Sequence, residues 1–247
     1  MFQRISLIFL IVGLFACSTP NLPLSLSYKG YPVNGATTTD TALSNLIQPY
    51  AKDVNRTMGK IIGFSNTNLF KKLPESGLGN FMADCMQQMA SKQFNQSIDI
   101  AFMNQGGIRA SINKGNITVG NVYELMPFDN LLVVQVVKGV VLEQFIQLIA
   151  ADGGWPISAG SSFIIQNKKA INIIINGKPI DPNKMYLTAN TDYVANGGSN
   201  AAMLKPIPFQ NRGYLLRDAL IDYIGDFTKA GKPIEGKIEN RVTISNE

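Results

Sequence analysis

The segments LGNFMADCMQQMASKQ (78–93), IDIAFM (98–103) and NQGGIR (104–109) decide the fold class of this chain. In the first segment, apolar residues recur at steps of three and four, which predicts a helix with one buried face. The second is a short apolar run that predicts a buried strand. The third contains two adjacent glycines, which let a chain turn sharply where a strand ends. A helix, a strand and a tight turn in this order predict a mixed α and β fold.

Helical and strand patterns alternate on both sides of this stretch. We expect further helices over 43–56, 140–149 and 215–227, and further strands over 61–64, 133–137, 171–175, 186–189 and 242–244. The Asn176-Gly177 pair is a strong turn signal, and we place it between the strands 171–175 and 186–189. No internal repeat is visible. We therefore predict an α+β fold, a single mixed-sheet domain with packed helices over residues 42–247.

The composition is that of a compact globular protein. Of the 247 residues, 45% are hydrophobic and 16% are charged. The formal net charge is +5, but no run of lysine or arginine is longer than two residues. Scattered positive charge does not indicate a nucleic acid polymer as partner, whereas it is compatible with a small anionic ligand.

The first residues have the layout of a secretory signal peptide, predicted over 1–16. Arg4 precedes an apolar run over 5–15, and the small residue Ala16 precedes Cys17. The run is too short to span a membrane as a helix, which needs about 20 apolar residues. The segment 14–17 resembles a bacterial lipobox, in which Cys17 would carry a lipid. The alternative is an ordinary cleaved signal with Cys17 unmodified.

The stretch after the signal is rich in Ser, Thr, Pro, Asn and Gly, and it predicts a flexible tether over 17–41. Ser18 follows the cysteine, which by resemblance to known sorting patterns favours the outer membrane. We therefore expect an exported bacterial lipoprotein, anchored in the membrane through Cys17. It would lie on the periplasmic side of the outer membrane or on the cell surface.

The residue types that are missing limit the chemistry. The sequence contains no histidine, which removes Ser-His and Cys-His nucleophile pairs and the commonest metal ligand. No Asp/Glu cluster with two-metal spacing is visible, and no phosphate-binding glycine fingerprint. Cys85 lies on the apolar face of the predicted helix over 78–93, so we expect a buried, inert thiol. We expect no catalytic residue and no metal site in this chain.

Three short polar segments, two of them with adjacent glycines, follow hydrophobic segments. They are 104–109, which ends in Arg109, 126–130, which contains Phe128, and 190–199, which contains Tyr193 and two glycines. An arginine offers a planar fork of donors to phosphate or carboxylate. Taken singly, each segment has an ordinary structural explanation: Arg109 as a surface residue on a turn, and Phe128 as a core residue.

Taken together, these segments resemble the C-terminal domain of the 5'-nucleotidase family. Further segments that fit the family's order and spacing are Pro74 to Phe81, Gly115 to Thr118, and Ile175 to Pro182 with Tyr186 after it. The resemblance covers roughly residues 54–244. In full-length members this substrate-binding domain is joined to a metallophosphatase domain, whose two metals are held by Asp, His and Asn. The present sequence has no counterpart of that half.

The resemblance implies a set of substrate-binding residues. Phe128 and Tyr193 stand where two aromatic rings sandwich the base, and Arg109 matches an arginine that contacts the anionic part of the substrate. Ser199 replaces an aspartate that holds the ribose hydroxyls, so ribose recognition differs here. Lys72 lies near where the family often has another arginine. The remaining implied residues are amides and glycines of the same segments: Asn104, Gly106, Gly107, Asn130, Asn196, Gly197 and Gly198.

Two functions from different classes follow from this resemblance. The chain could be the nucleotide-binding half of a split 5'-nucleotidase, which presents substrate to a separately encoded metallophosphatase. It could instead be a non-catalytic lipoprotein that binds nucleosides or nucleotides. The family is a hydrolase family, but this chain alone is expected to be inactive. Divalent metals are expected only in the partner, and no cofactor is expected in this chain. A scaffold without binding function is disfavoured because Arg109 and both aromatic residues are present.

Overall fold

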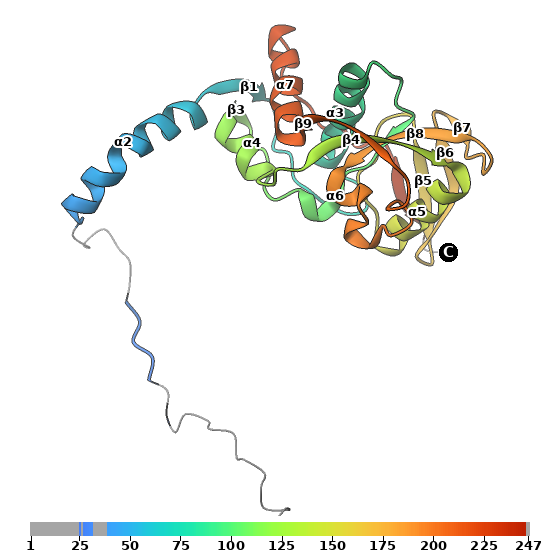
Figure 1. Ribbon diagram of the computed structural model, residues 1–247, viewed down its shortest axis with the longest axis horizontal. Helices are drawn as coiled ribbons and strands as arrows, with labels where there is room; N and C mark the ends of the chain where they lie inside the picture. The colour runs from blue at the N-terminus through green and yellow to red at the C-terminus, as the bar shows by residue number, and fades with distance from the viewer. Residues whose placement is uncertain (1–24, 26, 32–38, 246–247) are drawn as a thin grey trace, which may run out of the picture. The chain divides into compact units, whose positions relative to one another are not determined.

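The computed structural model describes residues 25, 27–31 and 39–245 (Figure 1). The chain divides into two units, residues 1–46 and 47–247. The predicted signal peptide, the predicted lipid attachment at Cys17 and most of the predicted tether lie outside the described residues. Within the described part, no helix is both long enough and apolar enough to cross a membrane.

The first described helix is α2 (Thr41–Met58), and the predicted start of the domain at residue 42 falls inside it. Asp40 caps it, because its Oδ1 accepts hydrogen bonds from the backbone N–H groups of Ala42 and Leu43 at 2.9 and 3.0 Å. No residue of this helix is buried. Its large exposed apolar side chains are Leu43, Leu46, Ile47, Tyr50 and Val54.

The strands of the second unit form three sheets among the described residues. An antiparallel pair joins β1 (Ile61–Ser65) and β3 (Gly115–Thr118). One four-stranded sheet has the order β10 (Val242–Ser245), β5 (Ser162–Gln166), β6 (Lys169–Ile175), β7 (Lys178–Pro179). The other has the order β2 (Ile100–Ala101), β8 (Met185–Thr191), β4 (Leu131–Lys138), β9 (Phe209–Leu215). Parallel and antiparallel pairs occur in both larger sheets, so the predicted α+β fold with mixed sheets is confirmed.

The sheet β2-β8-β4-β9 separates two hydrophobic cores, because successive side chains of a strand point to opposite faces. In β4, Leu132 and Val134 belong to the first core, and Val137 belongs to the second. The strand residues before the 104–109 segment alternate in the same way, with Ala101 in the first core and Phe102 in the second.

Helices α3 (Gly77–Phe94), α4 (Val119–Leu125) and α7 (Leu216–Lys229) supply the first core. The Oγ of Ser76 caps α3 by accepting a hydrogen bond from the Gly79 N–H at 3.0 Å. Asn95 ends it in the left-handed conformation, with φ of 54°. The predicted apolar face of this helix is confirmed, since all five of its residues are buried: Leu78, Phe81, Met82, Cys85 and Met89.

The second core lies between α5 (Gly139–Ala151) and the strands of both larger sheets. Its centre is aromatic: the ring of Phe145 lies 5.0 Å from that of Phe102 and 5.7 Å from that of Trp155, both edge to face. The Trp155 indole N–H donates to the Asp152 carboxylate at 2.6 Å. The polar end of this large side chain is therefore satisfied although the residue is buried.

The strand pairing around Asn176 and Gly177 differs from the prediction. Both residues have positive φ, 51° and 71°, as expected for a tight hairpin turn. The turn joins β6 to the short strand β7, whereas β8 lies in the other sheet. The residues of β8 are mostly buried, and β2 and β4 pair with its two edges. A strand with both edges occupied cannot also pair with β6. The strand β5 and the edge strand β9 were not predicted.

We predict that the Cys85 thiol is unreactive in the folded chain. Burial raises its pKa well above the ordinary value, and the nearby carboxylates of Asp84 and Asp222 add to the shift. The thiolate is the reactive form, so the folded protein should react with iodoacetamide at pH 8 only after opening. In a Cys17→Ser chain, we expect alkylation roughly a hundredfold or more slower than in the denatured chain. Equal rates in both states would contradict this.

Candidate binding site

One cavity of about 310 Å³ lies at an edge of the sheet β2-β8-β4-β9. Its lining residues are Asn104, Gly106, Gly107, Phe128, Asn130, Tyr193 and Ser199. All seven belong to the three glycine-bearing or aromatic segments singled out in the sequence. Four further residues were predicted as site residues but do not line this cavity: Arg109, Asn196, Gly197 and Gly198.

Strand direction explains why segments so far apart in sequence meet here. Asn104 follows β2 and Tyr193 follows β8, and these two strands are parallel. Their carboxyl ends therefore lie at the same edge of the sheet. Phe128 precedes β4, which is antiparallel to β8, so the amino end of β4 lies at that edge too.

The segment 104–109 is a tight turn that brings backbone close to the cavity. Gly107 donates its N–H to the Asn104 carbonyl at 2.9 Å. A Cβ atom at residue 107 would lie 2.9 Å from the Asn104 Oδ1 and 2.6 Å from the Met103 Cε, so only glycine fits without displacement. Asn104 is buried, and its Oδ1 has no hydrogen-bond partner within the described residues. That oxygen is an acceptor available to a ligand or a water.

Arg109 ties the turn to the helix before Phe128. Its N–H donates to the Leu125 carbonyl at 2.9 Å, and its Nη1 donates to the Gly106 carbonyl at 3.3 Å. The guanidinium carbon lies 5.9 Å from the centre of the Phe128 ring. Positive charge is thus placed next to the aromatic wall of the cavity.

Phe128 is not a core residue. The residue is 42% exposed, whereas Met126, two residues earlier, is fully buried and anchors the segment in the first core. The ordinary structural explanation for an isolated phenylalanine is therefore wrong at this position. A half-exposed aromatic ring that lines a cavity is available to stack on a ligand.

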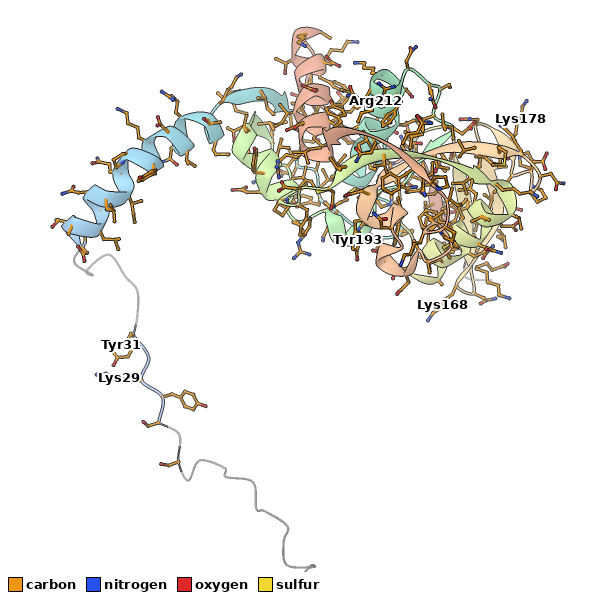
Figure 2. All side chains as sticks on the ribbon, in the orientation of Figure 1. Lys29, Tyr31, Lys168, Lys178, Tyr193 and Arg212 are labelled. Carbon is orange, nitrogen blue, oxygen red and sulfur yellow. The ribbon has the colours of Figure 1, made fainter. Side chains whose placement is uncertain are left out.

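Tyr193, labelled in Figure 2, contacts the turn that follows it. It lies in the short helix α6 (Asp192–Ala195), is 49% exposed, and its hydroxyl accepts a hydrogen bond from the Ser199 N–H at 3.2 Å. A Cβ atom at residue 198 would lie only 2.5 Å from the Cζ of the Tyr193 ring. Gly197 has φ of 93° and Ser199 has φ of 52°, so the turn passes through the left-handed region at both positions. The glycines therefore let the chain pass directly against the ring.

Asp192 is a structural residue of the site that the sequence analysis did not assign. Its Oδ1 accepts hydrogen bonds from the N–H groups of Leu131 and Tyr193, both at 2.9 Å. One carboxylate oxygen thus joins the start of β4 to the start of α6, and so links the two aromatic segments. Asn196 supports the same turn, since its Nδ2 donates to the Asp192 carbonyl at 2.9 Å. The sequence feature that could have indicated this role is an aspartate in the first turn of the helix that follows β8.

Comparison with known proteins identifies the domain. The model of the family described as "5'-nucleotidase, C-terminal domain" matches residues 56–206. The chain belongs to this family. It is 33% identical over 141 residues to protein UshA of Yersinia enterocolitica, covering 55% of this chain and 26% of that protein. It is 31% identical over 184 residues to the trifunctional nucleotide phosphoesterase YfkN of Bacillus subtilis, covering 68% of this chain and 12% of that protein.

A solved structure agrees with this assignment. The 5'-nucleotidase precursor of Thermus thermophilus superposes with a TM-score of 0.70 at 26% identity, covering 84% of this chain and 44% of that chain. The present chain therefore spans less than half the length of each of these three relatives.

Lys71 and its neighbour Lys72 lie in different surroundings. Lys71 contacts the 104–109 turn, because its Nζ donates to the Ile108 carbonyl at 2.7 Å. Lys72 lines a separate cavity of about 420 Å³ together with Phe70 and Glu75. Successive side chains of an extended segment point to opposite sides, so the two neighbouring lysines reach different parts of the surface.

The lining of the cavity carries no charged side chain. Ser199 contributes a neutral hydroxyl where the family resemblance implies an aspartate. Elsewhere in the described part of the chain, no group of three or more Asp, Glu, Cys or His residues could hold a metal ion. The arrangement can thus surround a planar, neutral group with aromatic and amide contacts. Arg109, near the Phe128 ring, can bind an anion beside that group.

We predict that Gly198→Ala displaces the Tyr193 ring without unfolding the domain. The added methyl group would overlap the ring, and the half-exposed tyrosine can rotate away. The hydrogen bond to the Ser199 N–H would be lost, which should lower the free energy of unfolding by about 1 kcal/mol. NMR contacts between the ring and residue 198 would report the movement. Gly225→Ala in α7 is the control, because nothing lies within 4 Å of that position. An unmoved ring in Gly198→Ala would contradict the packing described here.

Proposed function

We propose that this chain is the nucleotide-binding half of a split 5'-nucleotidase. In this proposal the base is clamped between Phe128 and Tyr193, and the phosphate is presented to a separately encoded metallophosphatase. The observation that carries the proposal is the cavity that both aromatic side chains line. Membership in the 5'-nucleotidase C-terminal domain family supports the choice of a nucleotide as ligand.

The lining supports a base rather than a phosphate inside the cavity. Both aromatic side chains are about half exposed, so each can present a ring face to a planar ligand. The other lining groups are glycines, amides and a hydroxyl, which can hydrogen-bond to the edge of a base without a net charge. The phosphate would lie towards Arg109, whose guanidinium offers paired donors to an anion.

A partner is proposed because hydrolysis needs groups that this sequence lacks. There is no histidine to act as a general base or as the usual metal ligand. The relatives are two- to eightfold longer than the matched part, which leaves room in them for a second domain. We propose that the equivalent domain is provided by another polypeptide that carries the divalent metals.

We also propose that the protein is exported and anchored through Cys17. The support is the sequence pattern of Arg4, the apolar run and Ala16 ahead of the cysteine. A periplasmic or cell-surface location would place the domain where extracellular nucleotides are available. Mass spectrometry of the native N-terminus distinguishes lipid-modified from unmodified Cys17.

Truncating either aromatic residue should weaken ligand binding. Stacking of a base on an aromatic side chain contributes about 1–3 kcal/mol, so Phe128→Ala and Tyr193→Ala should each reduce affinity by roughly tenfold. Calorimetry with AMP, UMP and adenosine measures the change, and thermal unfolding checks that each variant is folded. Phe64→Ala is the matched control, because Phe64 is 43% exposed, like Phe128, but lines a different cavity. The clamp is wrong if both aromatic variants bind as tightly as the wild type.

The purified chain alone should release no phosphate from AMP, UMP or 2',3'-cyclic AMP in the presence of manganese, zinc or cobalt. Adding a metallophosphatase of the same family from the same organism should produce hydrolysis that depends on Phe128 and Tyr193. Turnover by the chain alone that is abolished by substituting one of its own residues would overturn the split arrangement. Tight binding without hydrolysis in the mixture would instead identify a non-catalytic binding protein.

A further inference from the structure

Arg217 connects α7 to the segment that carries Phe128. It is the second residue of α7, and its side chain is only 9% exposed. Its Nη2 donates to the Asp129 carboxylate at 2.7 Å, and its Nη1 makes a long contact of 3.5 Å with the Phe128 carbonyl. The guanidinium carbon lies 4.2 Å from the centre of the Tyr123 ring. Arg217 therefore contacts the segment 126–130 and the helix before it with one planar group.

This arrangement contributes little to stability. The side chain of Asp129 is 81% exposed, so water screens its attraction for the guanidinium. The Nε of Arg217 is buried and has no hydrogen-bond partner within the described residues. Burying a charged group with an incomplete set of partners opposes folding, and an apolar residue of similar size is often as stable. The contacts do join α7 to the Phe128 carbonyl and to the Asp129 side chain.

The geometry at Phe128 needs such a restraint. Its ring is half exposed, so packing alone does not determine where it points. The segment is held at its far end, where Leu216 donates to the Asn130 carbonyl at 2.9 Å and Asp192 binds the Leu131 N–H. Arg217 is the one side chain in the described structure that hydrogen-bonds to Phe128 itself.

We propose that Arg217 is a positioning residue for nucleotide binding: it holds the Phe128–Asp129 backbone so that the Phe128 ring faces Tyr193 before the ligand arrives. This inference rests on the proposed base clamp. Without Arg217 the ring would have to be ordered on binding, which opposes association. The expected effect is a loss of affinity, although Arg217 does not line the cavity.

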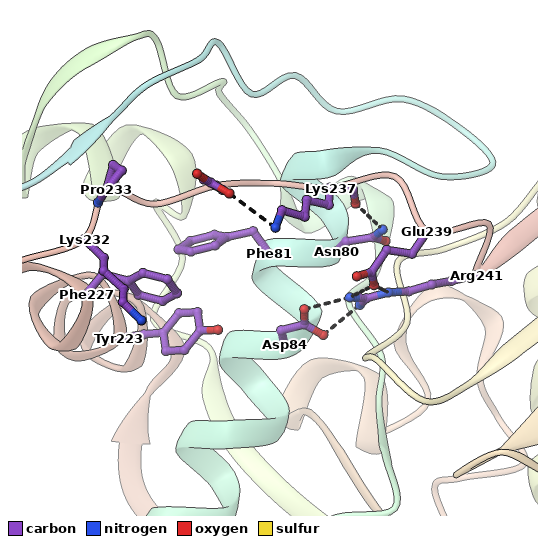
Figure 3. Close-up of a pocket in the computed structure, with 11 residues that line it drawn as sticks. Asn80, Phe81, Asp84, Tyr223, Phe227, Lys232, Pro233, Lys237, Glu239 and Arg241 are labelled. Carbon is purple, nitrogen blue, oxygen red and sulfur yellow. Dashed lines mark hydrogen bonds and ion pairs between the residues drawn. The ribbon is translucent and has the colours of Figure 1, made fainter. Parts of the chain in front are cut away.

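The test compares two buried arginines in the full chain. Arg217→Met should weaken binding of adenosine and AMP by roughly two- to tenfold in calorimetry, since ordering one side chain has a penalty of that size. Arg241→Met is the matched control. Arg241 is 6% exposed and pairs with Asp84 and Glu239 in a separate cavity of about 390 Å³ (Figure 3). Its loss should lower the melting temperature and leave the affinity unchanged. Arg217→Lys, which cannot form the same planar contacts, serves as the test variant if Arg217→Met does not fold.

A double-mutant cycle separates positioning from general destabilisation. If Arg217 acts through Phe128, then Arg217→Met should change affinity by less than about twofold in a Phe128→Ala chain. An equal loss of affinity with and without the Phe128 ring would overturn the inference, and so would wild-type affinity in Arg217→Met. Failure of the wild type to bind any of these ligands would overturn the proposed clamp, and this inference with it.

Discussion

The pairing of β4 with β8 is the constraint on which the site depends. The two strands are antiparallel, with partners running from Leu132 and Thr191 at one end to Lys138 and Met185 at the other. The end at Leu132 and Thr191 is where the chain enters β4 and leaves β8. The aromatic residues that line the cavity lie just outside these two points, in segments more than sixty residues apart in sequence. A shift of register by one residue would reverse every side chain of β8 between the two cores. The relative position of the two aromatic segments therefore depends on the register of this strand pair.

The two cores hold this pairing from opposite faces. Helices α3 and α7 cover one face, while α5 and the strands of the second sheet cover the other, around Phe145 and Trp155. At the edge, small polar contacts replace apolar packing: Asp192 joins the two aromatic segments, and the glycines let the backbone approach the rings. Rigid strands with a polar, glycine-rich edge are a common basis for binding sites, because the scaffold holds short loops in place.

At this edge of the sheet, the uncharged cavity lining is separate from the positive charge of Arg109. The cavity is lined by uncharged groups, and Arg109 lies next to the ring of Phe128. Asp129 and Asp192, the carboxylates of the same segments, are engaged by Arg217 and by backbone N–H groups. One oxygen of each carboxylate, Oδ1, therefore has a partner within the protein. In the proposed function, Ser199 stands where the family resemblance implies an aspartate for the ribose hydroxyls, so we expect sugar recognition to differ.

The sequence by itself determined the elements that depend on local periodicity and on single residues. The apolar face of α3, the strand β4 and the turn at Asn176 and Gly177 all follow from side-chain spacing or from glycine. The resemblance to the family also singled out all seven residues that line the cavity. Only the tertiary structure decided what depends on distant contacts. It decided that β7 pairs with β6, that Phe128 is half exposed, and that Lys71 contacts the turn. It also decided that Asp192 and Arg217 hydrogen-bond to the aromatic segments. These features could not be predicted because burial and hydrogen bonding between residues far apart in the chain arise only when the sheets and helices pack.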